Sequence, residues 1–283
     1  MNLFSLKGKI VLITGGAGYF GKFFVQGLLD FGAKVIIVEK SASGHEVGES
    51  LQEVKKKFLK KYPNRVFWYE TDLYDEKLTD SVYDTILKKH KKIDVLVNNA
   101  FEFGPRTGFK FGRKETIKSA THEEFSISFE SGIWWAVQAT RKFGPAMQKQ
   151  GAGAIINIAS SLGVIAPSPL TYEGFAHSVN PPAYSANKAA LLAWTRYSAA
   201  FLAPNVRVNA LSPGAIPNLS ENSRHNRGKE YKDKFLYNLG RKMVLQRCGK
   251  PEELVGALIF LASDASSYVS GHNLLVDGGW TVI

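Results

Sequence analysis

The sequence predicts an α/β protein built on a doubly wound parallel sheet of about seven strands, with helices on both faces. Two observations support this prediction. The 283 residues are 45% hydrophobic and 22% charged, which is typical of a globular protein that buries a core. Short apolar runs alternate with longer amphipathic stretches along the chain. Because neighbouring parallel strands need a crossover connection, usually a helix, this alternation favours a parallel sheet covered on both faces.

Seven apolar runs are the expected strands. In order they are residues 9–14, 34–39, 65–70, 93–100, 154–160, 206–212 and 273–279. Residues 19–31 have helical periodicity, so the chain opens with a strand, a helix and a second strand. No internal repeat occurs and no linker divides the chain, so we expect a single domain over residues 1–283.

Three segments interrupt the alternation, and each follows an expected strand. Residues 101–121 are rich in Phe, Gly and basic side chains, residues 164–183 contain four prolines, and residues 215–247 are rich in basic side chains. Loops that follow the strands of an open α/β sheet emerge at its carboxyl edge, where ligands bind. We therefore expect these three segments to form the substrate site.

Basic side chains gather in two of these segments, and the net charge of the chain is +11. Residues 101–120 carry five basic and two acidic side chains, and residues 217–247 carry eight and three. Without a nucleic-acid-binding motif, this charge favours an anionic small-molecule substrate over a nucleic acid; solvated loops or subunit contacts are the alternative. The expected contacts are Arg106, Arg113, Arg224 and Arg227, with apolar walls from Phe101, Phe103, Phe109 and Phe111.

Cysteine usage and apolar patterning bear on the cellular location. Cys248 is the only cysteine, so no internal disulfide is possible, and no group of Cys and His has the spacing of metal ligands. We therefore expect a reducing compartment and no metal. The apolar stretch near the N-terminus is too short for a signal peptide core, and no run of about 18 apolar residues occurs. The expected location is the cytoplasm, without a membrane partner.

The first turn, TGGAGYFG at residues 14–21, has the pattern of a dinucleotide-binding turn. Gly15, Gly18 and Gly21 follow a strand and open a helix, with Tyr19 and Phe20 between them. Glycines let the backbone turn tightly and approach a pyrophosphate, which the helix N-terminus stabilises through its free N–H groups. The turn therefore predicts a Rossmann-type sheet that binds a nicotinamide dinucleotide.

Acidic residues after the next two strands indicate how the adenosine end binds. Glu39 ends the second strand, where a carboxylate accepts hydrogen bonds from ribose hydroxyls and repels a 2′-phosphate. This favours NAD over NADP, although the adjacent Lys40 would partly neutralise the repulsion, and a solvated glutamate is the alternative. Asp72 and Leu73 follow the third strand. Asp72 either contacts the adenine edge or caps a loop.

Tyr184 and Lys188 lie four residues apart in the segment PAYSANKAALLAW, which has the pattern of a helix. Side chains at this spacing project from one face of a helix. A phenol is a weak base at neutral pH, but a neighbouring ammonium favours the phenolate and brings it into a range useful for proton transfer. The pair predicts general acid/base chemistry, with two surface residues as the alternative.

Taken together, these patterns resemble the short-chain dehydrogenase/reductase family over nearly the whole chain. The matching segments are TGGAGYFG at 14–21, NNA at 98–100, NIAS at 157–160, YSANK at 184–188, VRVNALSPG at 206–214 and residues 266–280. The resemblance implies that Tyr184 is the general acid/base, that Lys188 lowers its pKa and binds the nicotinamide ribose, and that Ser160 holds the substrate oxygen. It also implies cofactor contacts from Asn98, Ala100 and the backbone of Pro213, Gly214 and Ile216.

The chain departs from the family pattern in three places. Phe101 follows NNA where the family usually has glycine. Phe129 occupies the position of an asparagine that supports a proton relay to the lysine, so Glu130, Ser128 or Ser131 replaces it or the relay is lost. Ser160 lies 24 residues before Tyr184, a longer gap than is usual in the classical branch. That gap and the glycine turn resemble the extended branch, which processes nucleotide sugars, whereas the DGGW ending at 277–280 is classical.

The leading hypothesis is an NAD(H)-dependent oxidoreductase of carbohydrate metabolism that interconverts a secondary alcohol and a ketone, with an anionic sugar or nucleotide sugar as substrate. One alternative is a nucleotide-sugar epimerase or dehydratase that uses bound NAD. Another is a non-catalytic dinucleotide-binding protein. The resemblance also implies a homotetramer or homodimer.

Overall fold

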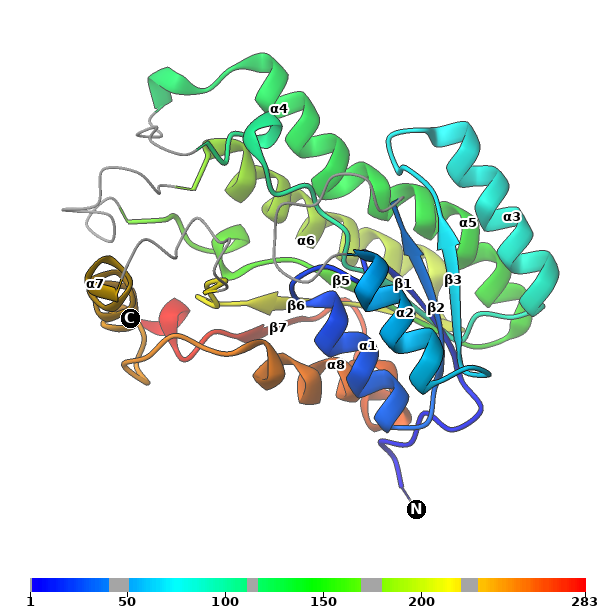
Figure 1. Cartoon of the computed structure of the whole chain (residues 1–283). Helices are drawn as coiled ribbons and strands as arrows, with labels where there is room; N and C mark the ends of the chain where they lie inside the picture. Colours follow the sequence, from blue (N-terminus) through cyan, green and yellow to red (C-terminus); the bar gives the residue numbers. More distant parts are fainter. Residues whose placement is uncertain (1, 41–50, 111–116, 169–179, 220–228) are drawn as a thin grey trace.

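A parallel sheet organises the computed structural model, which describes residues 2–40, 51–110, 117–168, 180–219 and 229–283. Its strands within these residues are β1 (Ile10–Thr14), β2 (Lys34–Glu39), β3 (Val66–Glu70), β4 (Val95–Asn98), β5 (Gly153–Ile158), β6 (Val206–Pro213) and β7 (Asn273–Val276). Their order is β3-β2-β1-β4-β5-β6-β7, and every neighbouring pair is parallel (Figure 1). The predicted fold class is confirmed.

The strand order reverses between β1 and β4, which are neighbours in the sheet although β2 and β3 separate them in sequence. In an open parallel sheet, ligands bind outside the carboxyl ends of the strands at such a reversal. The central strands are buried along most of their length; in β2 only the first residue, Lys34, is exposed. Burial on both faces is why these strands read as continuous apolar runs rather than as alternating patterns.

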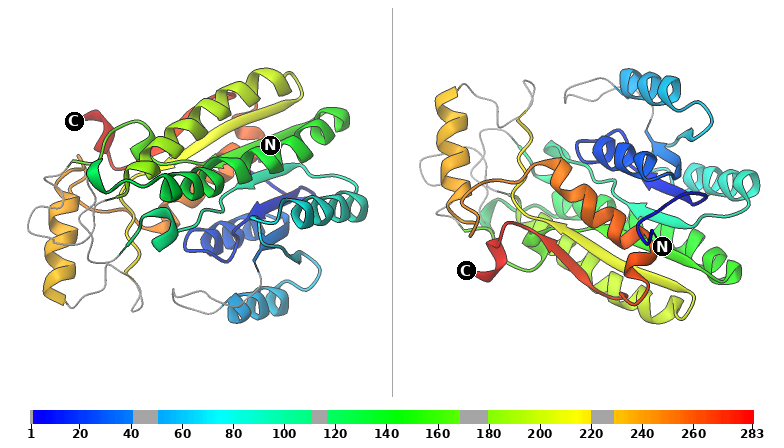
Figure 2. Two further views of the ribbon diagram at one scale, coloured as in Figure 1. Left: turned by 90° about the horizontal axis from the view of Figure 1, so that it is seen from above. Right: turned by 90° about the horizontal axis from the view of Figure 1, so that it is seen from below.

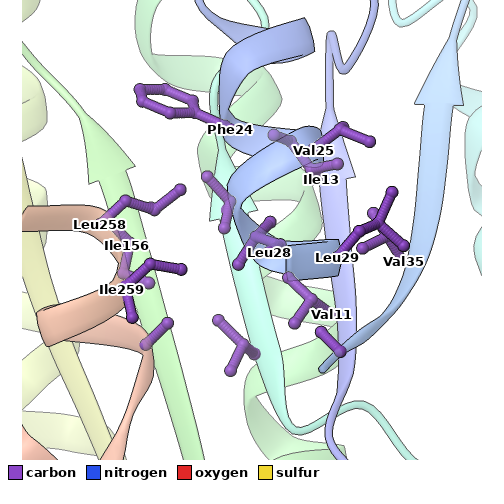
Figure 3. Packing of buried hydrophobic residues seen from close by; sticks show 14 of the residues in the cluster. Val11, Ile13, Phe24, Val25, Leu28, Leu29, Val35, Ile156, Leu258 and Ile259 are labelled. Carbon is purple, nitrogen blue, oxygen red and sulfur yellow. The ribbon is translucent and has the colours of Figure 1, made fainter. Parts of the chain in front are cut away.

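Helices α1 (Gly21–Asp30), α2 (Leu51–Lys61) and α8 (Val255–Ala262) cover one face of the sheet (Figure 2). Figure 3 shows their packing, in which apolar side chains of α1 and α8 meet those of the strands. The central members are Val11, Ile13, Phe24, Val25, Leu28, Leu29, Val35, Ile156, Leu258 and Ile259. This layer holds α1, and with it the first glycine turn, against the place between β1 and β4 where the strand order reverses.

Helices α3 (Glu76–His90), α5 (Trp135–Gln150) and α6 (Pro182–Leu202) cover the opposite face. Their buried side chains form a second cluster with the other side of the sheet, in which Tyr83 and Phe143 pack with ring centroids 5.0 Å apart. Pro182 stands in the first turn of α6, where its missing N–H leaves no helical hydrogen bond unmade. The α6 helix therefore begins just before Tyr184.

The remaining elements belong to the connections between strands and helices. They are α4 (His122–Phe129), α7 (Lys229–Gly240), the π-helical turn η3 (Glu130–Trp134), and the short turns η1 (Pro105–Thr107), η2 (Ile117–Ser119), η4 (Ser161–Gly163), η6 (Pro251–Leu254), η7 (Asp264–Ser266) and η8 (Trp280–Val282). Figure 1 shows α7 beside the C-terminus at one end of the sheet. Among the described residues, no helix is both long enough and apolar enough to cross a bilayer.

Candidate functional site

The glycine turn after β1 has a backbone that only glycine accommodates. Gly15 has a φ of +66°, and a Cβ built on it would lie 2.9 Å from the Cα of Ala100. A Cβ on Gly21 would lie 2.1 Å from the carbonyl oxygen of Gly15. The turn therefore folds tightly on itself and against the end of β4, and a side chain at either position would open it.

The N-terminus of α1 is suited to an anion. The helix begins at Gly21, directly after the turn, and its first turn contains no acidic side chain. The first N–H groups of a helix have no partner within the helix and favour a phosphate. Gly18 is exposed, whereas Phe20 packs against the core cluster under α1. These features fit the pyrophosphate of a dinucleotide.

Glu39 ends β2 and is bonded to the same turn. Its side chain is 8% exposed; Oε2 accepts a hydrogen bond of 3.1 Å from the Ala17 N–H, and Oε1 accepts one of 3.1 Å from the Lys40 N–H. Burial raises the pKa of this carboxyl, while the two backbone N–H groups and the Lys40 charge lower it. The predicted ribose ligand thus also braces the phosphate turn.

Asn99, which the sequence interpretation overlooked, holds the turn from the other side. Its Nδ2 donates to the carbonyl oxygens of Gly15 at 2.8 Å and Thr14 at 3.1 Å. Asn98, the residue predicted to shape the pocket, instead points its Nδ2 at Asn157 Oδ1, 2.8 Å away, inside the sheet. The NNA pattern was the available signal, since its two asparagines alternate between opposite sides of the strand.

Asp72 and Leu73, which the sequence predicts at the adenosine end of the cofactor, differ in how deeply they are buried. Asp72 is exposed, and its Oδ1 accepts a 3.0 Å hydrogen bond from the Tyr74 N–H, which is the loop-capping alternative. Leu73 is 8% exposed and packs in the core cluster with Leu12 and Val38. Its side chain belongs to the core, so only the backbone of residues 72 and 73 remains available to a ligand.

The segment after β6 faces the glycine turn. Pro213 ends β6, and a Cβ on Gly214 would lie 2.5 Å from the Cα of Asp277, at the end of β7. The Tyr19 hydroxyl donates a 2.9 Å hydrogen bond to the carbonyl oxygen of Pro217. Ile216 is half buried next to Gly249. The Tyr19 contact thus joins the glycine turn to the segment after β6, and the sequence predicts cofactor contacts from both.

Helix α6 carries Tyr184 and Lys188 on one face. The Lys188 side chain is 5% exposed, and its Nζ donates a 3.0 Å hydrogen bond to the carbonyl oxygen of Ile158, the last residue of β5. The same Nζ lies 5.8 Å from the centroid of the half-buried Tyr184 ring. Burial lowers the pKa of Lys188 to about 7. An amine of this kind can change its charge near neutral pH.

Ser160 lies two residues beyond the end of β5 and is 7% exposed. Its Oγ accepts a 3.2 Å hydrogen bond from the Leu162 N–H and caps the turn η4. That turn packs directly on α6, because a Cβ on Gly163 would lie 2.9 Å from the backbone carbon of Lys188. The structure therefore brings Ser160 and the Tyr184–Lys188 helix to the same end of the sheet.

Three phenylalanines of the 101–110 segment surround the Tyr184 ring. The centroids of Phe101 and Phe109 lie 5.4 Å from it and that of Phe103 lies 5.8 Å from it. The Phe101 ring also faces Lys188 Nζ at 4.9 Å. The three rings predicted to form apolar walls therefore lie beside Tyr184 and Lys188, whereas Phe111 lies outside the described residues.

The described basic residues of the same segment already have acidic partners. Arg106 lies 3.6 Å from Glu102, and Lys110 lies 2.5 Å from the nearly buried Glu124. Arg106, Lys110 and Glu124 line a pocket of about 320 Å³ with three other residues, Pro105, Thr121 and Glu123. A ligand anion would compete with these carboxylates. Arg113, Arg224 and Arg227 lie outside the described residues.

The three candidate replacements for the relay asparagine differ in their partners. Phe129 stacks on Phe125, with centroids 6.0 Å apart. The Ser131 hydroxyl donates to the Ile127 carbonyl oxygen at 3.1 Å, and Glu130 has its pKa raised by burial and by Glu76. Ser128 is different, because its hydroxyl accepts a 2.7 Å hydrogen bond from Asn187, the residue before Lys188.

Comparison with known sequences gives a consistent result. A family model described as Enoyl-(Acyl carrier protein) reductase matches residues 20–281. The 2-dehydro-3-deoxy-D-gluconate 5-dehydrogenase of Dickeya dadantii is 30% identical over 99% of this chain and 98% of its own length. The 7alpha-hydroxysteroid dehydrogenase of Bacteroides fragilis is 29% identical over 100% of this chain and 97% of its own.

Solved structures resemble the whole chain as well. A putative NAD(P) dependent gluconate 5-dehydrogenase from Beutenbergia cavernae, with bound NADP, has a TM-score of 0.81 at 27% identity and covers 100% of both chains. A short chain dehydrogenase from Leptospira borgpetersenii, with bound NAD+, has a TM-score of 0.77 at 29% identity, covering 99% of this chain and 96% of its own.

Proposed function

Because this chain belongs to the short-chain dehydrogenase/reductase family of oxidoreductases, we propose that it interconverts a secondary alcohol and a ketone with NAD(H). One observation carries the proposal: Lys188 Nζ is buried beside the Tyr184 ring at the carboxyl end of β5. We take the protein to be a single-domain, cytoplasmic homo-oligomer. The proposed substrate is an anionic sugar, which the sugar-acid dehydrogenases among the relatives support.

The chain's own residues would handle the proton. In the oxidising direction Tyr184 accepts the hydroxyl proton of the substrate, and in the reducing direction it donates a proton to the carbonyl oxygen. Protonated Lys188 favours the phenolate because an opposite charge nearby stabilises it. Ser160, near the same end of β5, holds the substrate oxygen. When bound, the nicotinamide ring accepts or supplies the hydride.

The residues that would hold the dinucleotide divide into three groups. The glycine turn and the N-terminus of α1 would bind the pyrophosphate. Glu39 and the backbone at Asp72 and Leu73 would bind the adenosine. A third group would bind the nicotinamide end. It comprises the backbone at Asn98 and Ala100 together with Tyr184, Lys188, Pro213, Gly214 and Ile216.

We expect the protein to prefer NAD to NADP. A 2′-phosphate beside the buried Glu39 carboxylate would place two anions together, a juxtaposition that costs several kcal/mol. Changing Glu39→Gln removes the charge while keeping the side-chain volume, and should tighten NADP binding by about tenfold or more. Isothermal titration with both cofactors measures this preference.

Glu70→Gln is the matched control for Glu39. Glu70 pairs with Glu39 in the register of β2 and β3, but it is exposed and bonded to Lys55. The Glu70→Gln change should leave the preference for NAD over NADP unchanged. Tighter binding of NADP than of NAD by the unmodified protein would contradict the assignment of Glu39 and implicate Lys40.

We expect sugar acids or sugar phosphates to be better substrates than neutral alcohols of the same size. Reversing Arg106 and Lys110 to Glu should raise the Michaelis constant for an anionic substrate by roughly 2- to 30-fold, because exposed ion pairs contribute about 0.2–1 kcal/mol each. NAD affinity should not change. Steady-state kinetics at low and high salt test this, since exposed charge pairs are screened by salt.

Lys118→Glu provides the control for the charge reversal. Lys118 is exposed in the same segment and does not line the pocket formed by Arg106 and Lys110. Equal kinetic effects of this change and of the double reversal would show that only net charge matters. If neutral alcohols are the best substrates and the reversal changes nothing, the anionic substrate is the wrong class.

A nucleotide-sugar epimerase or dehydratase is the second candidate function, since such an enzyme would use the same proton-transfer pair. The two differ in their redox balance. Product analysis with no net change in NADH would favour the epimerase or dehydratase, whereas stoichiometric NADH formation supports the dehydrogenase.

A further inference from the structure

Asn187 ties α6 to α4 from a fully buried position. Its side chain is 0% exposed, and its Nδ2 donates to the Ser128 hydroxyl at 2.7 Å and to the Ser128 carbonyl oxygen at 3.2 Å. Ser128 is itself 0% exposed and lies next to the end of α4. A buried amide that donates two hydrogen bonds to one residue of a neighbouring helix restricts how the helices can move relative to each other.

Gly132 makes room for this contact. A Cβ on Gly132 would lie 2.4 Å from Asn187 Cγ and 2.5 Å from its Oδ1. Gly132 lies within the π-helical turn η3, which continues directly from α4. Ser128, Gly132 and Asn187 therefore form one packed unit, in which the glycine is needed for the asparagine to fit.

The position of Asn187 on α6 links this unit to the proposed chemistry. Tyr184 lies three residues before Asn187, and Lys188 follows it. A displacement of this part of the helix therefore moves both side chains. We propose that Asn187 is a positioning residue: its amide clamps the start of α6 to α4 and so sets the separation of the Tyr184 phenol and the Lys188 ammonium. This inference rests on the proposed function.

The clamp uses the donor end of the amide. No described group bonds the buried Oδ1, whereas both hydrogen atoms of Nδ2 have acceptors on Ser128. An aspartate at this position would place a second acceptor against the Ser128 carbonyl oxygen. Asn187→Asp should therefore be at least as harmful as Asn187→Ala, although it conserves shape.

The titratable groups near this unit lie on α6, on α4 and on the elements packed beside them. On α6 they are Tyr184 and Lys188, and on α4 the buried one is Glu124, which pairs with Lys110 of the preceding loop. On η3 it is Glu130, whose carboxyl lies near Glu76 of α3. Asn187 donates to the carbonyl and hydroxyl oxygens of Ser128, so the clamp is a neutral contact and its loss removes no charge.

The test compares Asn187→Ala and Ser128→Ala with the unmodified protein. A loosened α6 should lower kcat by about 10- to 100-fold, because small misplacements of catalytic groups have effects of this size. A greater separation of ammonium and phenol weakens the stabilisation of phenolate, so the pH midpoint of alcohol oxidation should rise by about 0.5 to 1 unit. The affinity for NAD should stay within about twofold.

Ser126→Ala is the matched control. Its hydroxyl lies on the same helix α4 but is exposed, and it donates a 2.9 Å hydrogen bond to the His122 carbonyl oxygen of that helix. This change should leave both kcat and the pH midpoint unaltered. Should Asn187→Ala fail to fold, Asn187→Ser and Ser128→Ala apply the same test with smaller loss of packing. Ultraviolet difference titration of each variant against its Tyr184→Phe counterpart follows phenolate formation without turnover.

The inference fails if Asn187→Ala and Ser128→Ala fold and keep the pH midpoint and the phenolate titration of the unmodified protein. It also fails if Ser126→Ala shifts them equally. These outcomes are distinct from failure of the proposed function, which would appear as full activity in Tyr184→Phe. If Tyr184→Phe is inactive while the Asn187 variants titrate normally, only the positioning role is excluded.

Discussion

Tyr184→Phe is expected to lower turnover by about 10²- to 10⁴-fold while leaving NAD affinity nearly unchanged, because it deletes only the proton-transferring hydroxyl. The Tyr184 ring packs against Phe101, Phe103 and Phe109, and phenylalanine preserves these contacts. Folding should therefore be little affected. Single-turnover kinetics with saturating NAD, together with titration of NADH binding, separates the loss of chemistry from any loss of binding.

Tyr69→Phe is the matched control for this variant. Its hydroxyl lies 2.9 Å from His90 Nε2, to which it is hydrogen bonded. Tyr69 is in β3, at the edge of the sheet and remote from β5 and α6, so activity should be retained. Turnover of Tyr184→Phe at the unmodified rate, under conditions limited by chemistry, would show that another group moves the proton. The Ser160→Ala variant should also be impaired, but it retains the proton donor.

Lys188→Met should abolish most activity and, unlike Tyr184→Phe, should also weaken NAD binding. Methionine has a similar length but neither favours the phenolate nor donates to ribose hydroxyls. The expected loss in kcat/KM is at least as large as for Tyr184→Phe, about 10²- to 10⁴-fold. Full NAD affinity in Lys188→Met would contradict the assignment of this lysine to the ribose.

The same change should stabilise the fold at low pH. Burial lowers the pKa of Lys188 from 10.5 to about 7, so between these values the unfolded chain binds a proton that the folded chain does not. The contribution of this group to stability therefore rises as the pH increases through that window, and below it the folded protein retains a buried ammonium. Each pKa unit corresponds to about 1.4 kcal/mol, and the lost Ile158 hydrogen bond offsets about 1 kcal/mol. Lys188→Met should therefore gain about 4 kcal/mol near pH 6.

Urea unfolding of both proteins at pH 6 and pH 10 measures this effect. The stability advantage of Lys188→Met should disappear toward pH 10, because the folded lysine is then neutral and pH 10 lies close to the unfolded pKa of 10.5, so that little of the protonation cost remains. Lys118→Met, at an exposed position, should show no such pH dependence. A constant difference between Lys188→Met and the unmodified protein at both pH values would mean that the amine is not buried as an ammonium at pH 6.

Features encoded by short stretches of chain were predictable. The seven apolar runs became β1 to β7, with ends that differ from the expected ones by up to three residues, because runs buried on both faces have a recognisable composition. Glu39 was expected at the end of its strand and lies there. The spacing of Tyr184 and Lys188 specified a shared helix face before any packing was known.

Contacts between distant segments were not predictable in the same way. The Tyr19 hydroxyl meets Pro217, Asn99 holds Gly15, and Asn187 meets Ser128, yet none of these pairs is adjacent in sequence. The basic segment around Arg106 was interpreted from its charge alone, and its acidic partner Glu102 was counted only as a reduction of that charge. Which charges pair depends on side-chain directions that composition does not encode.

The sequence by itself determined the parallel α/β architecture, the glycine turn and the shared helix face of Tyr184 and Lys188, because periodicity and local backbone geometry act over a few residues. Only the tertiary structure decided that Lys188 is buried with a pKa near 7, that phenylalanines enclose Tyr184, and that Asn187 joins α6 to α4. These properties arise from desolvation and close packing between elements far apart in the chain, and both depend on the surroundings of a residue rather than on its type.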